Sequence, residues 1–254
     1  MRGDEILEIN IQNYDRKDIL VETLKYIKKP RGSFHIVSLN PEIFTLINEH
    51  PDYAETVREA QIRIVDGVGV VLAGRILGIG PIHRVTGVEL MLDLLELANK
   101  GSFRVVLIGG GPKIAEEVVE CQKQRFPEAK LFGIEGIHDI NNPTEDEEKK
   151  LFTIIADRKP HLVFVAFGSP EQELWLYRNR HKFEATVCMG VGGTFDFLSG
   201  HVHRAPKLIR SIGLEWLFRL VLQPWRWKRQ LRLLQFSGLI LKQKFQGASK
   251  QRAH

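Results

Sequence analysis

Six short runs of apolar, β-branched residues recur along the chain, and each is bounded by glycine, proline or small polar residues. Runs of this length and composition predict buried β-strands. The six predicted strands span residues 33–39, 61–65, 103–108, 130–134, 161–167 and 185–191.

Between these strands lie segments whose apolar residues recur at helical spacing, at residues 51–60, 87–99, 112–126, 144–157 and 170–183. Several begin with proline, which is favoured in the first turn of a helix. Strands and helices in strict alternation predict an α/β fold: a Rossmann-like, mostly parallel sheet with helices on both faces. We assign this body to residues 1–203 and a basic helical C-terminal appendage to residues 204–254.

Composition fits a globular protein, with 43% apolar and 26% charged residues. The two cysteines, Cys121 and Cys188, are too few for a disulfide framework. The N-terminus lacks the apolar core of a signal peptide, and no apolar run reaches the roughly 18 residues of a membrane span. We therefore expect a cytoplasmic or peripheral protein.

The charge is unevenly distributed. From residue 204 onward there are twelve Lys and Arg but one acid, Glu215, whereas the rest of the chain has 24 bases and 30 acids. Tryptophan, phenylalanine and leucine alternate with these bases, as in helices that lie on a membrane surface. This charge indicates that the segment contacts an anionic membrane or a phosphate group, rather than only packing on the body. Nucleic acid is the alternative anionic partner.

The carboxyl ends of parallel strands are where such folds bind ligands. One loop there, Gly109-Gly110-Gly111-Pro112, suits either a nucleotide phosphate or a tight turn. Ile114 occupies the place of the third glycine of a dinucleotide motif, which argues against a nicotinamide-dependent oxidoreductase.

Asp66 follows the second predicted strand and precedes a glycine-rich turn. A carboxylate half-buried there could have a raised pKa and act as a general base. The alternative role for Asp66 is the N-cap of a helix over residues 68–77, and position alone favours this role.

A metal site is not expected. His83, His201 and His203 have no third ligand at suitable spacing, and the chain has no Asp-x-Asp motif for holding a metal on a diphosphate. A leaving diphosphate would have to be neutralised by Arg, Lys or backbone amides.

Taken together, several motifs resemble the WecG/TagA/CpsF family of bacterial glycosyltransferases. They occur in family order from about residue 34 to residue 232, which covers most of the chain. These motifs are SLNPE at 38–42, VDGVGV at 65–70, RVTG at 84–87, GSPEQE at 168–173, GVGGTFDF at 190–197 and RAP at 204–206.

The resemblance implies an inverting transferase, without metal or other cofactor, that moves a sugar from a UDP-sugar onto an undecaprenyl-diphosphate-linked acceptor at the inner face of the cell membrane. The sugar would be N-acetylmannosamine, its uronic acid or glucose. The body would bind the UDP-sugar and the appendage the membrane. No nucleic-acid partner is implied, and a homo-oligomer is compatible with the sequence.

The resemblance also assigns roles to individual residues. Asp66 is similar to the base that deprotonates the acceptor, and Arg84 to a contact that stabilises the leaving UDP. Three arginines of the appendage are similar to residues brought over the site. The implied substrate-binding residues are Ser38, Asn40, Thr86, Gly109, Gly111, Gln172, Asp196, Arg219, Arg226 and Arg229. The chain departs from the family pattern at Ser38, often threonine, and Val65, usually proline.

Overall fold

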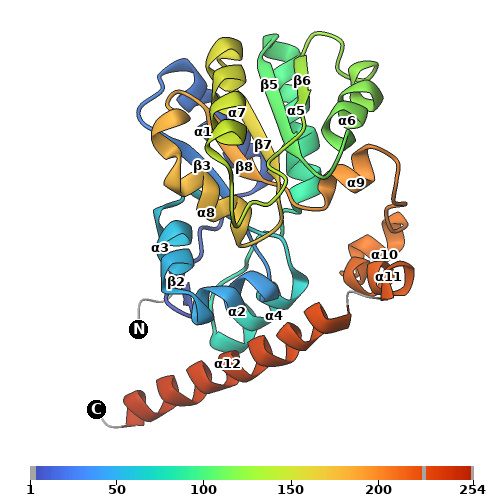
Figure 1. Cartoon of the computed structure of the whole chain (residues 1–254). Coiled ribbons are helices and arrows are strands. Elements are labelled where there is room, and N and C mark those ends of the chain that lie inside the picture. Colours follow the sequence, from blue (N-terminus) through green and yellow to red (C-terminus); the bar gives the residue numbers. More distant parts are fainter. Residues whose placement is uncertain (1–3, 225–226, 253–254) are drawn as a thin grey trace.

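The computed structural model describes residues 4–224 and 227–252, and its centre is a sheet of six parallel strands (Figure 1). The strands are β3 (Phe34–Leu39), β4 (Ile62–Val65), β5 (Arg104–Gly109), β6 (Lys130–Ile134), β7 (Leu162–Ala166) and β8 (Val187–Gly190). Their spatial order is β4-β3-β8-β7-β5-β6. All six predicted strands and the predicted fold class are confirmed.

One face of the sheet is covered by four helices. These are α1 (Arg16–Lys28), α5 (Gly87–Gly101), α6 (Ile114–Lys123) and α9 (Thr194–Leu198). Buried strand residues such as Ile36, Leu107 and Phe164 pack against them in one apolar cluster. Burial of this cluster accounts for the continuous apolar runs in the strands.

Neighbouring residues of a strand point to opposite sides, so the same strands also bury side chains on the opposite face, where they form two apolar clusters. The helices on this face are α2 (Pro41–Glu49), α3 (Pro51–Glu59), α4 (Val68–Leu77), α7 (Glu145–Arg158) and α8 (Glu171–Arg178). Val37 and Leu39 of β3 share a cluster with residues of α2, α3 and α4. Val106 and Ile108 of β5 share another with α7 and α8.

The five helices predicted between strands are observed as α3, α5, α6, α7 and α8, although α8 stops at Arg178 and a 3₁₀ turn, η1 (Arg180–Lys182), follows. The strict alternation was wrong, because two helices follow each of β3 and β4. Asn40 caps α2 through its side chain and Pro41 occupies the first turn, so the residues that directly follow β3 begin a helix that was not predicted. Helix α1 and the hairpin β1 (Glu5–Ile6)–β2 (Ile9–Asn10) were also not predicted.

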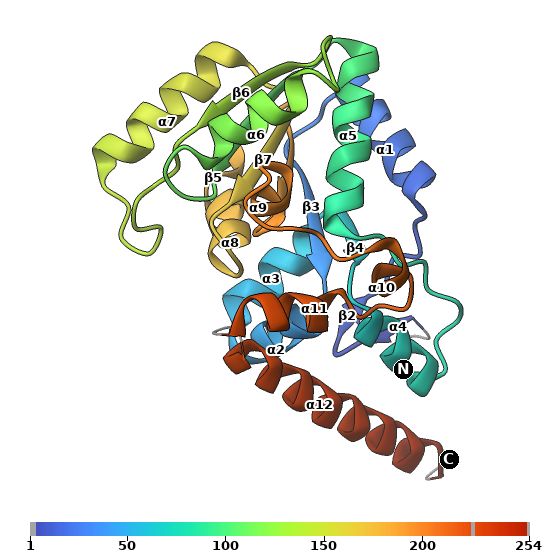
Figure 2. The ribbon, with the colours of Figure 1, turned by 90° about the vertical axis from the view of Figure 1, so that its right-hand side faces the viewer.

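Within its described residues, the C-terminal segment contains the α-helices α10 (Lys207–Ser211), α11 (Glu215–Leu222) and α12 (Trp227–Arg252). Helix α12 runs across α2 and α4 (Figures 1 and 2). Its Phe236 and Ile240 are buried there, and Phe236 lies 5.5 Å from Phe44, centroid to centroid. One side of the appendage therefore packs on the body, as the alternative interpretation of the tail predicted.

The appendage also carries apolar side chains that are exposed. Leu208, Val221, Leu234 and Phe245 are each between 69% and 79% exposed. Helix α11 ends at Leu222, close to Pro224, so Arg219 and Arg229 stand on different helices. Among the residues that the structure describes, none of the helices combines the length and apolarity needed to span a bilayer.

Candidate active site

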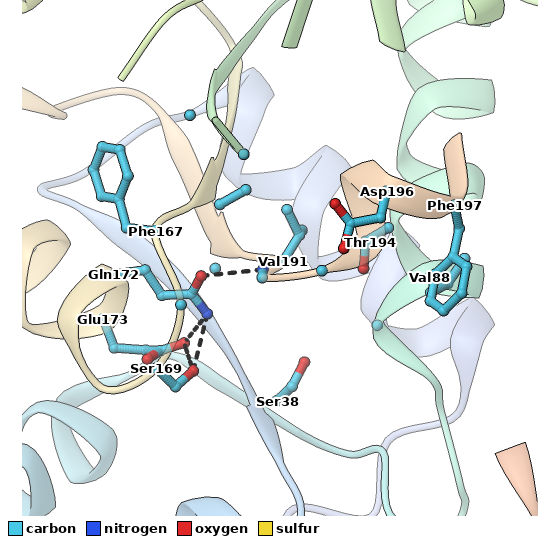
Figure 3. A pocket seen from close by; sticks show the side chains of 18 of the residues that line it. Ser38, Val88, Phe167, Ser169, Gln172, Glu173, Val191, Thr194, Asp196 and Phe197 are labelled. Carbon is cyan, nitrogen blue, oxygen red and sulfur yellow. Dashed lines mark hydrogen bonds between the residues drawn. The ribbon is translucent and has the colours of Figure 1, made fainter. Parts of the chain in front are cut away.

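A cavity of about 1790 Å³ opens at the carboxyl ends of the strands. Its walls come from the segments that follow all six strands and from α11 of the appendage. Figure 3 shows part of it, with side chains of β3, α5, α8 and α9 facing one another. Most of the predicted site residues border this space: Ser38, Asn40, Asp66, Arg84, Thr86, Gly109, Gly111, Gln172, Asp196 and Arg219.

Asp66 stands at the end of β4, where its backbone N–H donates to the carbonyl of Leu39 at 2.9 Å. Its Oδ2 accepts the backbone N–H of Gly87, the first residue of α5, at 3.2 Å. Helix α4 begins after Gly67 without any side-chain cap. The helix cap over residues 68–77, which position alone favoured, was therefore wrong, because the turn directs this carboxylate across to α5 instead.

The environment of Asp66 suits proton transfer. Burial raises the pKa of the Asp66 carboxyl to about 6, while the Gly87 N–H and the neighbouring Arg84 guanidinium limit the increase. At neutral pH the group is mostly ionised, yet it is a stronger base than an exposed aspartate. Such a carboxylate can accept a proton from a hydroxyl bound in the cavity.

Ser38 of β3 reaches the same point as Asp66. A Cβ atom placed on Gly87 would lie 3.4 Å from the Ser38 Oγ and 3.5 Å from the Asp66 Oδ2. The two side chains therefore converge on the start of α5, each within van der Waals reach of the space beside Gly87. A hydroxyl and a carboxylate at this point can both contact one bound sugar.

Arg84 lies beside Asp66 and links it to the appendage. Its Nε donates to the Asp66 carbonyl at 2.9 Å, and its Nη1 donates to the Arg210 carbonyl at 3.0 Å. The Arg210 side chain in turn lies 3.5 Å from Glu89 of α5. Arg84 therefore holds the turn that carries Asp66 and the end of α10 together.

Glu89 joins the appendage to the body. Its Oε1 lies 3.6 Å from Arg204 and 3.5 Å from Arg210, and Arg204 also donates to Glu215 of α11 at 3.1 Å. These ion pairs are only partly exposed, so solvent screens them less than surface pairs. These ion pairs fix the start of α5, the segment that leads into α10, and α11 next to one another near Asp66.

Two predicted site residues use their side chains as helix caps. The Asn40 Oδ1 accepts the N–H of Ile43 at 3.0 Å, and the Thr86 Oγ1 accepts the N–H of Glu89 at 3.3 Å. Both still border the cavity. Their first effect is to fix the starts of α2 and α5 beside Asp66.

The glycine loop after β5 has a backbone that other residues rarely adopt. Gly109, Gly110 and Gly111 have φ angles of +88°, +85° and +110°. The Gly110 N–H donates to the Ala166 carbonyl at 2.9 Å, which fixes the loop to β7. The loop forms one wall of the cavity and leaves space there for a ligand.

Gln172 is 3% exposed and its amide is held by protein groups. Its Oε1 accepts the Gly192 N–H at 3.1 Å, and its Nε2 donates to Ser169 at 3.0 Å and to Glu173 at 2.6 Å (Figure 3). Sequence reasoning missed Glu173. An acid that directly follows a site residue in a helix gives no sign in the sequence that it is buried. Glu173 is 2% exposed.

Asp196 of α9 meets the appendage across the cavity. Its Oδ2 lies 3.2 Å from the Nη2 of Arg219, whose guanidinium also lies 4.9 Å from the ring centroid of Phe197. Arg219 is thus brought to the site, as expected. Arg226 lies outside the described residues, as does the side chain of Arg229, although the Arg229 backbone belongs to α12.

The described histidines form no cluster of metal ligands. Within residues 4–224 and 227–252, no three His, Cys, Asp or Glu side chains are grouped so that they could hold a metal ion. His201 instead contacts Glu117 at the surface. Metal independence stays a prediction.

A parallel α/β sheet, a large cavity at its carboxyl edge and a carboxylate with a raised pKa inside that cavity define an enzyme that acts on a bound small molecule. Comparison with known proteins identifies the reaction class. Residues 5–250 match the glycosyl transferase WecG/TagA/CpsF family. The chain belongs to this family and is a glycosyltransferase.

Two similar curated proteins bear the same name, N-acetylglucosaminyldiphosphoundecaprenol N-acetyl-beta-D-mannosaminyltransferase. The protein from Bacillus spizizenii is 34% identical over 217 residues, which cover 85% of this chain and 82% of the relative. The protein from Staphylococcus aureus is 33% identical over 216 residues, which cover 84% and 82%. Relatives of this similarity share the chemistry of the family rather than every substrate.

Proposed function

We propose that this enzyme transfers N-acetylmannosamine from UDP to an undecaprenyl-diphosphate-linked N-acetylglucosamine, with inversion at the anomeric carbon. The names of the two relatives support this acceptor and this sugar. The uronic acid of the same sugar and glucose are the other donors that the family resemblance allows. UDP as the carrier and the absence of a metal or cofactor are part of the proposal.

The observation that carries the proposal is the position of Asp66, a carboxylate with a pKa of about 6 at the floor of the cavity. In a single displacement, an acceptor hydroxyl oxygen attacks the anomeric carbon and its proton passes to Asp66. The bond from that carbon to the diphosphate breaks, and UDP leaves with the electron pair. Proton removal by a positioned base contributes roughly 10²–10⁴-fold to such a rate.

The charge that develops on the leaving diphosphate needs cations, and two arginines border the cavity. Arg84 uses Nε and Nη1 in its bonds to backbone carbonyls, which leaves Nη2 for a phosphate oxygen. Arg219 is held by Asp196 at the opposite wall, and a bound phosphate would compete for it. The amides of the glycine loop and Arg226 and Arg229 are further candidates.

The appendage is proposed to rest on the inner face of the cell membrane, where the lipid-linked acceptor is located. Its exposed leucines, valine and phenylalanine would enter the headgroup region, while exposed bases such as Lys207, Lys242 and Lys244 would pair with anionic lipids. An exposed apolar surface of this kind favours a membrane over nucleic acid, since phosphate backbones attract charge rather than leucine.

The proposal is tested by incubating the enzyme with a short-chain lipid-diphosphate N-acetylglucosamine and a panel of UDP-sugars. We expect UDP release and a product heavier by one N-acetylhexosamine only with UDP-N-acetylmannosamine, and a β-linkage by nuclear magnetic resonance. Transfer from another UDP-sugar alone would change the assigned donor. A lack of transfer from every donor would contradict the proposed function.

A further inference from the structure

The buried carboxyl group of Glu173 takes no part in the displacement described above, yet it borders the cavity. Three donors converge on it from two segments. The Tyr53 hydroxyl of α3 donates to its Oε2 at 3.1 Å, while Ser169 and Gln172 donate to its Oε1 at 3.1 Å and 2.6 Å. Tyr53 is fully buried, so this contact is closed to solvent.

An acceptor at Oε1 decides the orientation of the Gln172 amide. The amide nitrogen can only donate, so it turns toward Glu173 and Ser169, and the amide oxygen turns toward the Gly192 N–H. Without an acceptor at residue 173, the Gln172 amide nitrogen would lose its hydrogen bond to that residue, and the amide orientation would be less well defined. The Gly192 N–H would then lose a hydrogen bond inside the protein.

The end of β8 is built around this pair of side chains. A Cβ atom on Gly190 would lie 2.6 Å from the Glu173 Oε1 and 2.7 Å from the Gln172 Nε2, closer than real contacts allow. The backbone at Gly190 therefore rests directly on both side chains. From here the chain passes through Gly192 into α9, which carries Asp196 and its contact with Arg219.

We propose that Glu173 is a positioning residue for the active site: its Oε1 orients the Gln172 amide, and the amide oxygen holds the loop of residues 190–193 that leads to Asp196. Glu173 itself does not touch the reacting atoms. Its consequence for UDP binding rests on the proposed function, because Asp196 is a nucleotide contact only if UDP is the carrier.

Hydrogen exchange at the Gly192 amide tests the positioning role without any ligand. We expect Glu173→Met, which removes the acceptor, to speed this exchange about tenfold, and Glu173→Gln, which keeps one carbonyl oxygen, to restore most of the protection. A Gly192 exchange rate in Glu173→Met equal to wild type would overturn the proposal. So would equal acceleration in Met and Gln variants.

A matched pair of tyrosines serves if Glu173→Met fails to fold. Tyr53 and Tyr177 both join α3 to α8 through a carboxylate, Tyr53 inside the protein and Tyr177 at the surface, 3.1 Å from Glu55. Tyr53→Phe frees one side of the Glu173 carboxyl, so Gly192 exchange should rise about threefold, and Tyr177→Phe should leave it unchanged. Identical Gly192 exchange in the two variants would refute the positioning role.

UDP binding by calorimetry adds the functional readout. We expect Glu173→Met to weaken the Kd for UDP about tenfold and Glu173→Gln to stay within about threefold of wild type. If wild-type enzyme fails to bind UDP, the proposed donor is wrong, while the exchange result still decides the role of Glu173. If UDP binds Glu173→Met as tightly as wild type, the loop is not positioned by Glu173 for the nucleotide.

Discussion

The Asp66 carboxylate accepts the backbone N–H of Gly87 at 3.2 Å, so the end of β4 is joined directly to the start of α5. This bond points the carboxylate into the cavity and away from α4, the helix that follows it in sequence. It also supplies a donor that partly stabilises the ionised form. The balance between that donor and burial leaves a base suited to neutral pH.

The first prediction concerns the pH dependence of transfer. Because Asp66 must be ionised to accept a proton, kcat/KM should be constant above its pKa and fall about tenfold per pH unit below pH 6. A profile recorded from pH 4.5 to 8 with the short-chain acceptor measures this limb. A limb near pH 4, where an exposed aspartate titrates, would show that the free enzyme does not use a buried carboxylate.

The second prediction concerns stability. Burial raises the pKa of Glu173 to about 7, so the folded state binds this proton more tightly than the unfolded chain. The associated stability is complete below about pH 4, the pKa range of an unfolded glutamate, and is lost as pH rises through 7. The full effect is roughly 3 kcal/mol.

Denaturant unfolding of Glu173→Gln against wild type at several pH values isolates this effect. The neutral variant should gain stability relative to wild type as pH rises from 5 to 8. His35, whose burial lowers its pKa to about 4, acts in the opposite direction but in both proteins alike. A stability difference that does not vary with pH would mean that Glu173 titrates in its ordinary range.

The third prediction concerns Arg84, which bonds to the carbonyls of both Asp66 and Arg210. Arg84→Met should lower kcat at least about 100-fold, since it removes a cation near the leaving group and loosens the turn that carries Asp66. Arg104→Met is the control, because Arg104 also donates to a carbonyl, that of Lys159, at the other end of β5. Equal kcat in the two variants would show that Arg84 has no role in the transfer reaction.

The six strands were predictable because buried parallel strands are continuous apolar runs, and the loops between them follow from the same pattern. What each loop side chain does was not. Asp66 has the position of a helix cap, and only the tertiary approach of Gly87 makes it the acceptor for a different helix. Glu173 was missed for the same reason, since one of its three donors, Tyr53, lies 120 positions away in sequence.

The appendage shows both kinds of outcome. Its charge and aromatic residues indicated an interfacial segment, yet the sequence pattern did not separate the residues that pack on α2 from those that face outward. Phe236 and Phe245 look alike in sequence, but the first is 4% exposed and the second 69%. The difference depends on where α12 crosses the body, which no local pattern specifies.

The fourth prediction follows from that difference. Leu234→Glu and Phe245→Glu, on the exposed side of α12, should lower binding to vesicles of anionic lipid about tenfold or more with little change in Tm. Phe236→Ala should instead destabilise the fold by about 3–5 kcal/mol. Val21→Glu on α1, 51% exposed, is the control for adding a surface acid. Unchanged vesicle sedimentation of the first two variants would exclude this face from the membrane.

The fifth measurement is the transfer rate of Asp66→Asn, which keeps the shape of the side chain and removes its basicity. With UDP-N-acetylmannosamine and the short-chain acceptor at pH 7.5, kcat should fall by roughly 10²–10⁴-fold while the Kd for UDP stays within about threefold of wild type. Asp93→Asn, at an aspartate of α5 paired with Arg16, should transfer at the normal rate. Transfer by Asp66→Asn at close to the wild-type rate would contradict the assignment of Asp66 as the base.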